Sequence, residues 1–126
     1  MNHIDTHVAL WLRAGDRARL KPIRRTLDVE DLAISPFAIL ELQALFEIGR
    51  IRETGRWVSQ HLFEDYGVTV ADSFLAEACD RAVDLSFTRD PFDRLIGAHA
   101  LASGVPLLTV DEVLLEHLPC ARWGSS

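Results

Sequence analysis

The fold class is decided by the stretch Val105-Pro106-Leu107-Leu108-Thr109-Val110-Asp111, in which a short apolar strand ends in an acid. His3-Ile4-Asp5 repeats this layout near the N-terminus, where Thr6 and a helix-forming run follow the aspartate. Short apolar strands that lead into helices are typical of a parallel sheet covered by helices on both faces. Ligands of such sheets bind beyond the carboxyl ends of the strands, so the two aspartates mark the edge where we expect chemistry.

The rest of the chain continues the alternation of strands and helices. Ser35-Pro36 and Asp90-Pro91 each supply an N-cap followed by proline at the first helical position. We expect strands at residues 3–5, 32–35, 67–70, 105–110 and 121–123. We expect helices at residues 8–13, 18–28, 36–49, 53–62, 73–83 (capped by Asp72 or Ser73), 91–104 and 111–118. These elements predict an α/β protein, a three-layer α/β/α sandwich with a central, mostly parallel sheet.

Length and composition indicate one globular domain that spans residues 1–126. The hydrophobic fraction of 48% and the charged fraction of 25% are close to the averages for globular proteins. No apolar run approaches the roughly 18 residues of a membrane span, and the first residues lack the layout of a signal peptide. We therefore expect a cytoplasmic protein with no membrane partner. Cys79 and Cys120 stand apart from any CxxC or Cys/His cluster, which favours two reduced thiols.

The net charge of −6 weighs against a nucleic-acid partner, because phosphate binding draws on lysine and arginine. The distribution of charge weakens that objection. Residues 1–56 hold nine basic and eight acidic side chains, whereas residues 57–126 hold four and eleven. Six basic side chains lie between residues 13 and 25 with Asp16 as the only acid among them. This stretch fits a solvated helix face and an RNA contact about equally well.

Asp5 and Asp111 each follow a strand and precede a helix, so each has an ordinary alternative role as a helix N-cap. Neither residue alone distinguishes a cap from a site. Two such acids in one parallel sheet would open onto the same edge if their strands are neighbours.

Glu41 is the most informative acid, because its neighbours one helical turn away are all apolar: Phe37, Ala38, Ala44 and Leu45. The glutamate therefore points along the stripe that should face the core. A buried carboxylate is unfavourable unless it is paired or bound to a metal, and no basic residue lies within one turn. For Glu41 the functional interpretation outweighs the structural one.

Asp93 lies at the third position of the helix that begins in Asp90-Pro91-Phe92-Asp93-Arg94. A capping box with Asp90 is the structural alternative, although glutamate or glutamine is the usual partner at that position. The small residues Gly97, Ala98 and Ala100 would let this helix lie close to the sheet. That packing would bring Asp93 to the carboxyl edge.

Carboxylates that converge repel one another and partly hold their protons, and a hard divalent cation reverses this. A set of oxygen ligands without histidine or cysteine fits Mg²⁺ or Mn²⁺ better than zinc. Such ions activate water and neutralise charge on a phosphodiester during hydrolysis. The four acids Asp5, Glu41, Asp93 and Asp111 therefore predict a metal-dependent nuclease.

The segment Ile4-Asp5-Thr6-His7-Val8-Ala9-Leu10-Trp11-Leu12 resembles the opening of PIN domains, specifically the VapC-like toxins. Ser35-Pro36 followed by Leu40-Glu41-Leu42 is similar to their second acidic motif. Asp90-Pro91-Phe92-Asp93-Arg94-Leu95-Ile96 and Leu108-Thr109-Val110-Asp111 are similar to the third and fourth. The order and spacing agree over the whole chain. One departure is the run Ala38-Ile39-Leu40, which leaves the shape of the groove, and so the choice of partner, open.

The resemblance implies a single PIN-like nuclease domain with Mg²⁺- or Mn²⁺-dependent endoribonuclease activity. It also implies a homodimer and a cognate antitoxin that inhibits the enzyme. The residues that match the family's metal-binding and catalytic acids are Asp5, Glu41, Asp93 and Asp111. We expect Thr6, Asp90 and Thr109 to support the site without binding the ion. Arg13, Arg17, Arg50 and Arg52 are candidates for contact with the RNA backbone.

Three alternatives are weighed against the nuclease. A phosphoacceptor receiver domain would show an acidic pair after the first strand and a lysine at a late strand end, but Asp5 stands alone and Lys21 is the only lysine. A phosphatase with an aspartate nucleophile would show Asp-x-Asp where this chain has Asp5-Thr6-His7. A catalytically inactive PIN-like binding module stays open, although the presence of all four acids favours activity.

Overall fold

A parallel sheet of five strands runs through the computed structural model, which describes residues 1–124. The strands are β1 (Asn2–Ile4), β2 (Leu32–Ile34), β3 (Thr69–Val70), β4 (Leu107–Leu108) and β5 (Ala121–Arg122). Their order across the sheet is β3-β2-β1-β4-β5, and every neighbouring pair is parallel. The prediction of a central parallel sheet is confirmed, with strands that are shorter than expected.

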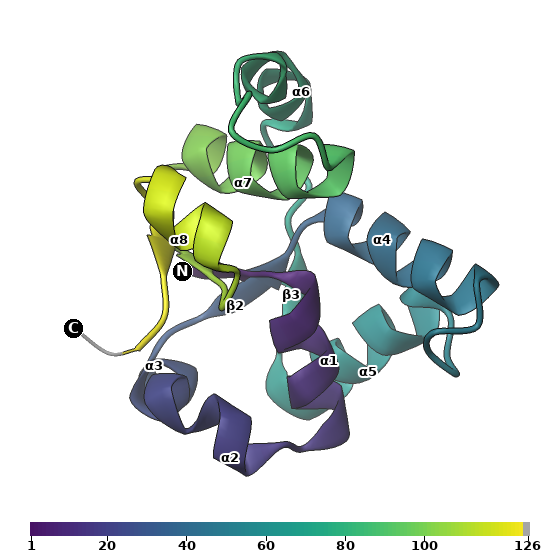
Figure 1. Cartoon of the computed structure of the whole chain (residues 1–126). Coiled ribbons are helices and arrows are strands. Elements are labelled where there is room, and N and C mark those ends of the chain that lie inside the picture. The colour runs from purple at the N-terminus through teal and green to yellow at the C-terminus, as the bar shows by residue number, and fades with distance from the viewer. Residues whose placement is uncertain (125–126) are drawn as a thin grey trace.

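Helices cover both faces of the sheet. Figure 1 shows α6 (Leu75–Val83) and α7 (Pro91–Ser103) on one side, and α1 (Thr6–Ala14) and α5 (Gly55–Tyr66) on the other. The remaining helical segments are α2 (Arg17–Leu20), η1 (Lys21–Ile23), α3 (Arg24–Val29), α4 (Pro36–Glu47) and α8 (Glu112–His117). None of the helices formed by residues 1–124 has the length and apolar character needed to span a membrane.

The first strand, β1, lies at the centre of the sheet, and all three of its side chains are buried. Ile4 is fully buried and is in register with Ile34 of β2 and Leu108 of β4. Successive side chains of a strand point to opposite faces, so Ile4 faces the α1 layer and His3 faces α7. Both layers therefore pack on β1, and the residue after it is held at the middle of the carboxyl edge.

His99 ties α7 to the segments that surround it. Its ring is fully buried and contacts the ring of His3 edge to face, with centroids 4.9 Å apart. The Ser73 carbonyl can only accept, so His99 Nε2 donates to it at 2.8 Å. His99 Nδ1 then accepts from the Ser35 hydroxyl at 2.7 Å. Since Ser35 also caps α4, His99 fixes α7 relative to the start of α4.

Two of the predicted helix boundaries are wrong. The helix expected at residues 18–28 is divided into α2, the 3₁₀ turn η1 and α3, because Pro22 has no N–H to donate and its ring obstructs a continuous α-helix. The helix α6 has neither Asp72 nor Ser73 as its cap. Its N-cap is Phe74, which has φ 63 and makes no side-chain capping bond.

A substitution at Gly55 tests the close approach of α5 to α4. A Cβ at Gly55 would meet the backbone oxygen of Ile39 and lie 3.1 Å from the backbone nitrogen of Gln43. We expect Gly55→Ala to lower the free energy of unfolding by about 2–3 kcal/mol, because backbone atoms cannot move aside as side chains do. Urea denaturation measures the change.

Gly67→Ala is the matched control, because Gly67 has φ 69 and nothing within 4 Å of an added Cβ. The control should lose only about 1 kcal/mol from its left-handed backbone. Equal losses in the two variants would contradict the packing explanation.

Candidate active site

Asp5 is the buried centre of the candidate site. It follows β1, caps α1 and is 5% exposed. Its Oδ1 accepts from the backbone N–H of Thr6 at 2.8 Å, and its Oδ2 accepts from the hydroxyl of Thr109 at 2.6 Å. Burial raises the pKa of the Asp5 carboxyl, while the bonds from Thr109 and Thr6 act in the opposite direction. Asp5 therefore caps α1, and its hydrogen bonds only partly offset the effect of burial on its pKa.

Thr109 and Asp111 bring the end of β4 to the same edge as Asp5. Thr109 is fully buried, and its hydroxyl oxygen accepts from the backbone N–H of Asp111 at 3.1 Å. Asp111 caps α8: its Oδ1 accepts from the backbone N–H groups of Val113 at 2.9 Å and Leu114 at 3.0 Å. Because β1 and β4 are neighbours, the two strand-end acids open onto one edge.

Glu41 reaches this edge from α4. It is partly buried, and its Oε1 accepts a very short hydrogen bond from the hydroxyl of Thr6. Burial raises the pKa of the Glu41 carboxyl, and the negative charges of Asp5 and Asp90 raise it further against the bond from Thr6. Thr6 thus links Asp5, through its backbone, to Glu41, through its side chain.

Asp93 completes the group from the first turn of α7. The cap of this helix is Asp90, whose Oδ1 accepts from the backbone N–H groups of Phe92 at 2.8 Å and Asp93 at 3.3 Å. Burial raises the pKa of the Asp93 carboxyl to about 7, and four negative charges add to the effect, in decreasing order those of Asp90, Asp111, Asp5 and Glu41. The charges of these four acids therefore all act on Asp93.

The carboxylates converge without forming a closed ligand shell. Within residues 1–124, no three histidine, cysteine, aspartate or glutamate side chains are grouped closely enough to hold a metal ion. The chemistry of the donor set nevertheless fits a hard divalent cation, since the donors are carboxylate oxygens, and burial together with neighbouring negative charge raises the pKa values of Asp5, Glu41 and Asp93. Asp93, Asp111 and Glu41 would have to come closer to Asp5 to enclose an ion.

His7 is a neighbour of the site that the sequence interpretation missed. It is exposed on the first turn of α1, and its positive charge, when present, opposes the burial that raises the pKa of Asp5 and of Glu41. The available signal was its position two residues after Asp5, at the start of the helix that Asp5 caps.

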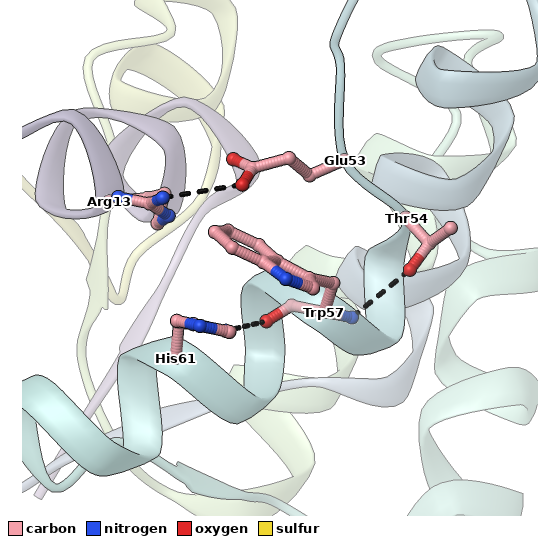
Figure 2. Close-up of polar contacts among 5 residues, drawn as sticks. All are labelled: Arg13, Glu53, Thr54, Trp57 and His61. Carbon is pink, nitrogen blue, oxygen red and sulfur yellow. Dashed lines mark hydrogen bonds and ion pairs between the residues drawn. The ribbon is translucent and has the colours of Figure 1, made fainter.

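Arg13 differs from the other three arginines expected to contact RNA. Figure 2 shows its guanidinium beside Glu53 and above the indole of Trp57. Its Nη2 lies 3.2 Å from Glu53 Oε2, and its Cζ lies 4.3 Å from the centre of the indole ring. Arg17 on α2, and Arg50 and Arg52 between α4 and α5, are exposed. Arg13 is thus already engaged within the protein.

Arg13→Met should lower the free energy of unfolding by about 1–2 kcal/mol, because it removes a partly exposed ion pair and a cation–π contact between α1 and α5. Urea denaturation monitored by tryptophan fluorescence measures this loss. The matched control, Arg17→Met, should change stability by less than about 0.5 kcal/mol. Equal unfolding midpoints for both variants would show that the Arg13 contacts contribute nothing.

Asp93→Asn should stabilise the metal-free protein at pH 8. The folded-state pKa of about 7 exceeds the ordinary value of 3.8, so the charged form is disfavoured in the folded state and stability is lost as pH rises through 7. We expect a gain of about 2 kcal/mol at pH 8, discounted because Asp93 is partly exposed, that shrinks toward pH 5.

Urea denaturation in chelator at both pH values measures the effect of Asp93→Asn. Asp80→Asn on the exposed surface of α6 is the control and should show no such pH-dependent gain. A variant less stable than the unsubstituted protein at pH 8 would contradict mutual repulsion at this edge.

Comparison with known proteins agrees with this fold. The PIN domain family matches residues 3–118. Ribonuclease VapC22 of Mycobacterium tuberculosis (strain ATCC 25618 / H37Rv) is 31% identical over 118 residues, which cover 90% of this chain and 89% of that protein.

Two solved structures share the fold. A chain in the crystal structure of VapBC2 from Rickettsia felis, bound to a DNA fragment from its promoter, superposes with a TM-score of 0.70 at 17% identity, covering 97% of this chain and 98% of that one. A chain in the crystal structure of DNA-bound VapBC from Salmonella typhimurium gives 0.60 at 21% identity, covering 96% and 94%. On its sequence match, the chain belongs to the PIN domain family and, within it, to the VapC-like proteins.

Proposed function

We propose that this protein is a Mg²⁺- or Mn²⁺-dependent endoribonuclease. The observation that carries the proposal is the convergence of Asp5, Glu41, Asp93 and Asp111 at one edge of the sheet, where burial, and after it the charges of Asp90, Asp111, Asp5 and Glu41, raise the pKa of Asp93 to about 7. A relative named as a ribonuclease, 31% identical over most of both chains, supports RNA as the substrate.

In this proposal Asp5, Asp93 and Asp111 hold the divalent cation, and Glu41 holds it directly or through water. When bound, the cation supplies an activated water and neutralises the charge that develops on the phosphodiester. Thr109 keeps the buried Asp5 carboxylate in place through its 2.6 Å hydrogen bond. The hydroxyl of Thr6 does the same for Glu41, so a threonine hydrogen bond orients the carboxylate of both Asp5 and Glu41.

The acids alone would repel an RNA phosphate, so the chain needs positive charge near them. Arg17, Arg50 and Arg52 are exposed and available for the RNA backbone. The engagement of Arg13 with Glu53 and Trp57 favours a structural role for that residue over RNA contact.

We further propose that the protein is the toxin of a toxin–antitoxin pair and that it forms a homodimer. The antitoxin is supported by the solved structures of VapBC assemblies that share this fold. Large apolar side chains on α4, at its C-cap and on α5 are exposed and would be covered by a partner: Leu40, Ile48 and Phe63 are 57%, 68% and 58% exposed. The homodimer rests on the resemblance to VapC-like toxins.

Cleavage of a mixed cellular RNA pool by the purified protein tests the enzyme. We expect cutting with Mn²⁺ or Mg²⁺, loss of cutting in chelator, and a fall of about 100-fold or more in Asp93→Asn. Binding of Mn²⁺, followed by calorimetry, should weaken in the same variant. Asp80→Asn, which keeps all four site acids, is the matched control and should cut as the unsubstituted protein does.

Equal cutting by Asp93→Asn would mean a misplaced site or a contaminating nuclease. A folded protein that neither cuts RNA nor binds Mn²⁺ would favour the inactive PIN-like binding module over the enzyme.

A further inference from the structure

A row of aromatic side chains leads away from the carboxylates along α1. His7 lies two residues after Asp5 and is exposed, and Trp11 follows one helical turn later, about 6 Å along the axis. The centres of the two rings are 6.5 Å apart. The row therefore begins at the edge of the candidate active site.

The row continues onto the chain that follows β5. The ring of Trp11 contacts that of Trp123 edge to face, with centroids 5.8 Å apart, and both indoles are partly exposed. The guanidinium of Arg19 lies over Trp11 at 5.5 Å from the ring centre and is itself well exposed. Residues 104 positions and more apart in sequence thus share one aromatic surface.

Beyond Trp123 the surface opens into a hollow of about 350 Å³ between α3 and the sheet. Arg25 of α3 and Arg122 of β5 line it, together with Asn2 and Glu30. Arg122 is in register with Leu108, so its side chain lies on the same face of the sheet as the α1 layer.

Both arginines of the hollow are available to an anion. The ion pairs formed within residues 1–124 include neither Arg25 nor Arg122. The nearby carboxylate of Glu30 accepts from the Asn2 side chain at 3.1 Å. Two exposed guanidinium groups in a concave, polar place are suited to a phosphate.

Trp57 differs from the tryptophans of this row, because both faces of its indole are covered by other side chains. Arg13 lies 4.3 Å from its ring centre and His61 stacks on it at 3.6 Å. Two groups this close to one ring centre must lie on opposite faces, and Figure 2 shows the indole between them. Trp57 therefore has no free face, in contrast to the row on α1.

We propose that this strip, formed by His7, Trp11, Trp123, Arg122 and Arg25 and called here the α1–β5 strip, holds the single-stranded RNA segment next to the bond that is cut. Bases stack along the aromatic rings, and a backbone phosphate enters the hollow between Arg25 and Arg122. Aromatic side chains on which bases stack, combined with arginines that hold the backbone, are the arrangement that binds single strands with little regard to sequence. The inference rests on the proposed ribonuclease function.

Binding of a fluorescein-labelled ten-nucleotide single-stranded RNA to the Asp93→Asn protein with Mn²⁺ tests the strip, with fluorescence anisotropy as the readout. Adding Arg25→Gln and Arg122→Gln should weaken binding about tenfold and reduce the slope of log Kd against log salt by about 0.7, the value for one phosphate neutralised on a single strand. Adding Trp123→Leu should weaken binding about tenfold with the salt slope unchanged, because stacking releases no counterions.

The matched control is the pair Arg56→Gln and Arg81→Gln, which removes the same charge from exposed sites on α5 and α6. Its Kd should stay within twofold of the parent. Circular dichroism checks the fold of each variant. If Trp123→Leu does not fold, the exposed arginine pair alone decides.

The outcomes separate this inference from the function on which it rests. If the unsubstituted protein cuts RNA while the arginine pair and its control bind RNA equally, the strip is overturned and the nuclease stands. If the arginine pair leaves RNA affinity unchanged but weakens inhibition by the antitoxin, the strip is a protein-binding surface and the inference is overturned. If the unsubstituted protein neither binds nor cuts RNA, both proposals fail.

Discussion

The buried carboxylate of Asp5 is the constraint on which the rest of this site depends. A charged group at the end of a central strand is costly to bury, so the surrounding chain must supply hydrogen bonds to both of its oxygens. The Thr109 hydroxyl at the end of β4 and the Thr6 amide at the start of α1 do so. The hydrogen bonds that Asp5 accepts therefore fix how β1 and β4 align at the carboxyl edge and where α1 begins. Through the Thr6 side chain it also sets the position of Glu41 on α4.

The other acids are held at the same edge by ordinary helix chemistry. Asp111 and Asp90 cap α8 and α7, and the cap at Asp90 leaves Asp93 in the first turn facing the other carboxylates. His99 connects α7 to the cap of α4, so the helices that carry Asp93 and Glu41 do not move independently. The helices α1, α7 and α8 thus begin at this edge, where their acids add to the negative charge of Glu41 on α4. This excess is the physical reason to expect a divalent cation there.

Much of this arrangement could be predicted from the sequence. Alternating short strands and capped helices predicted the parallel sheet, and the apolar neighbours of Glu41 predicted its inward direction. The interruption at Pro22 was predictable in principle, because proline cannot continue a helix, but the periodicity of residues 18–28 obscured it. The left-handed Phe74 had no signal, since no local rule favours an aromatic residue there.

Side-chain partnerships across the fold were beyond prediction. The sequence contains three tryptophans and twelve arginines, but it does not indicate which of them contact other side chains within the fold. Arg13 contacts Trp57 only because α1 packs on α5. Trp11 contacts Trp123 only because β5 forms the edge strand of the sheet. Such contacts depend on topology, and a residue's role changes with the neighbour that the topology gives it.

The central position of β1 has a consequence for the order in which the protein is made. Residues 2–5 leave the ribosome before Thr109, whose hydroxyl covers Asp5 and lies 104 residues later in the chain. At a synthesis rate of about 5–20 residues per second, β1 waits about 5–20 s for β4. During that time the nascent chain has Asp5 and Glu41 but neither Asp111 nor the strand that orders them. An unfinished chain therefore cannot present the assembled carboxylates, whatever RNA surrounds it.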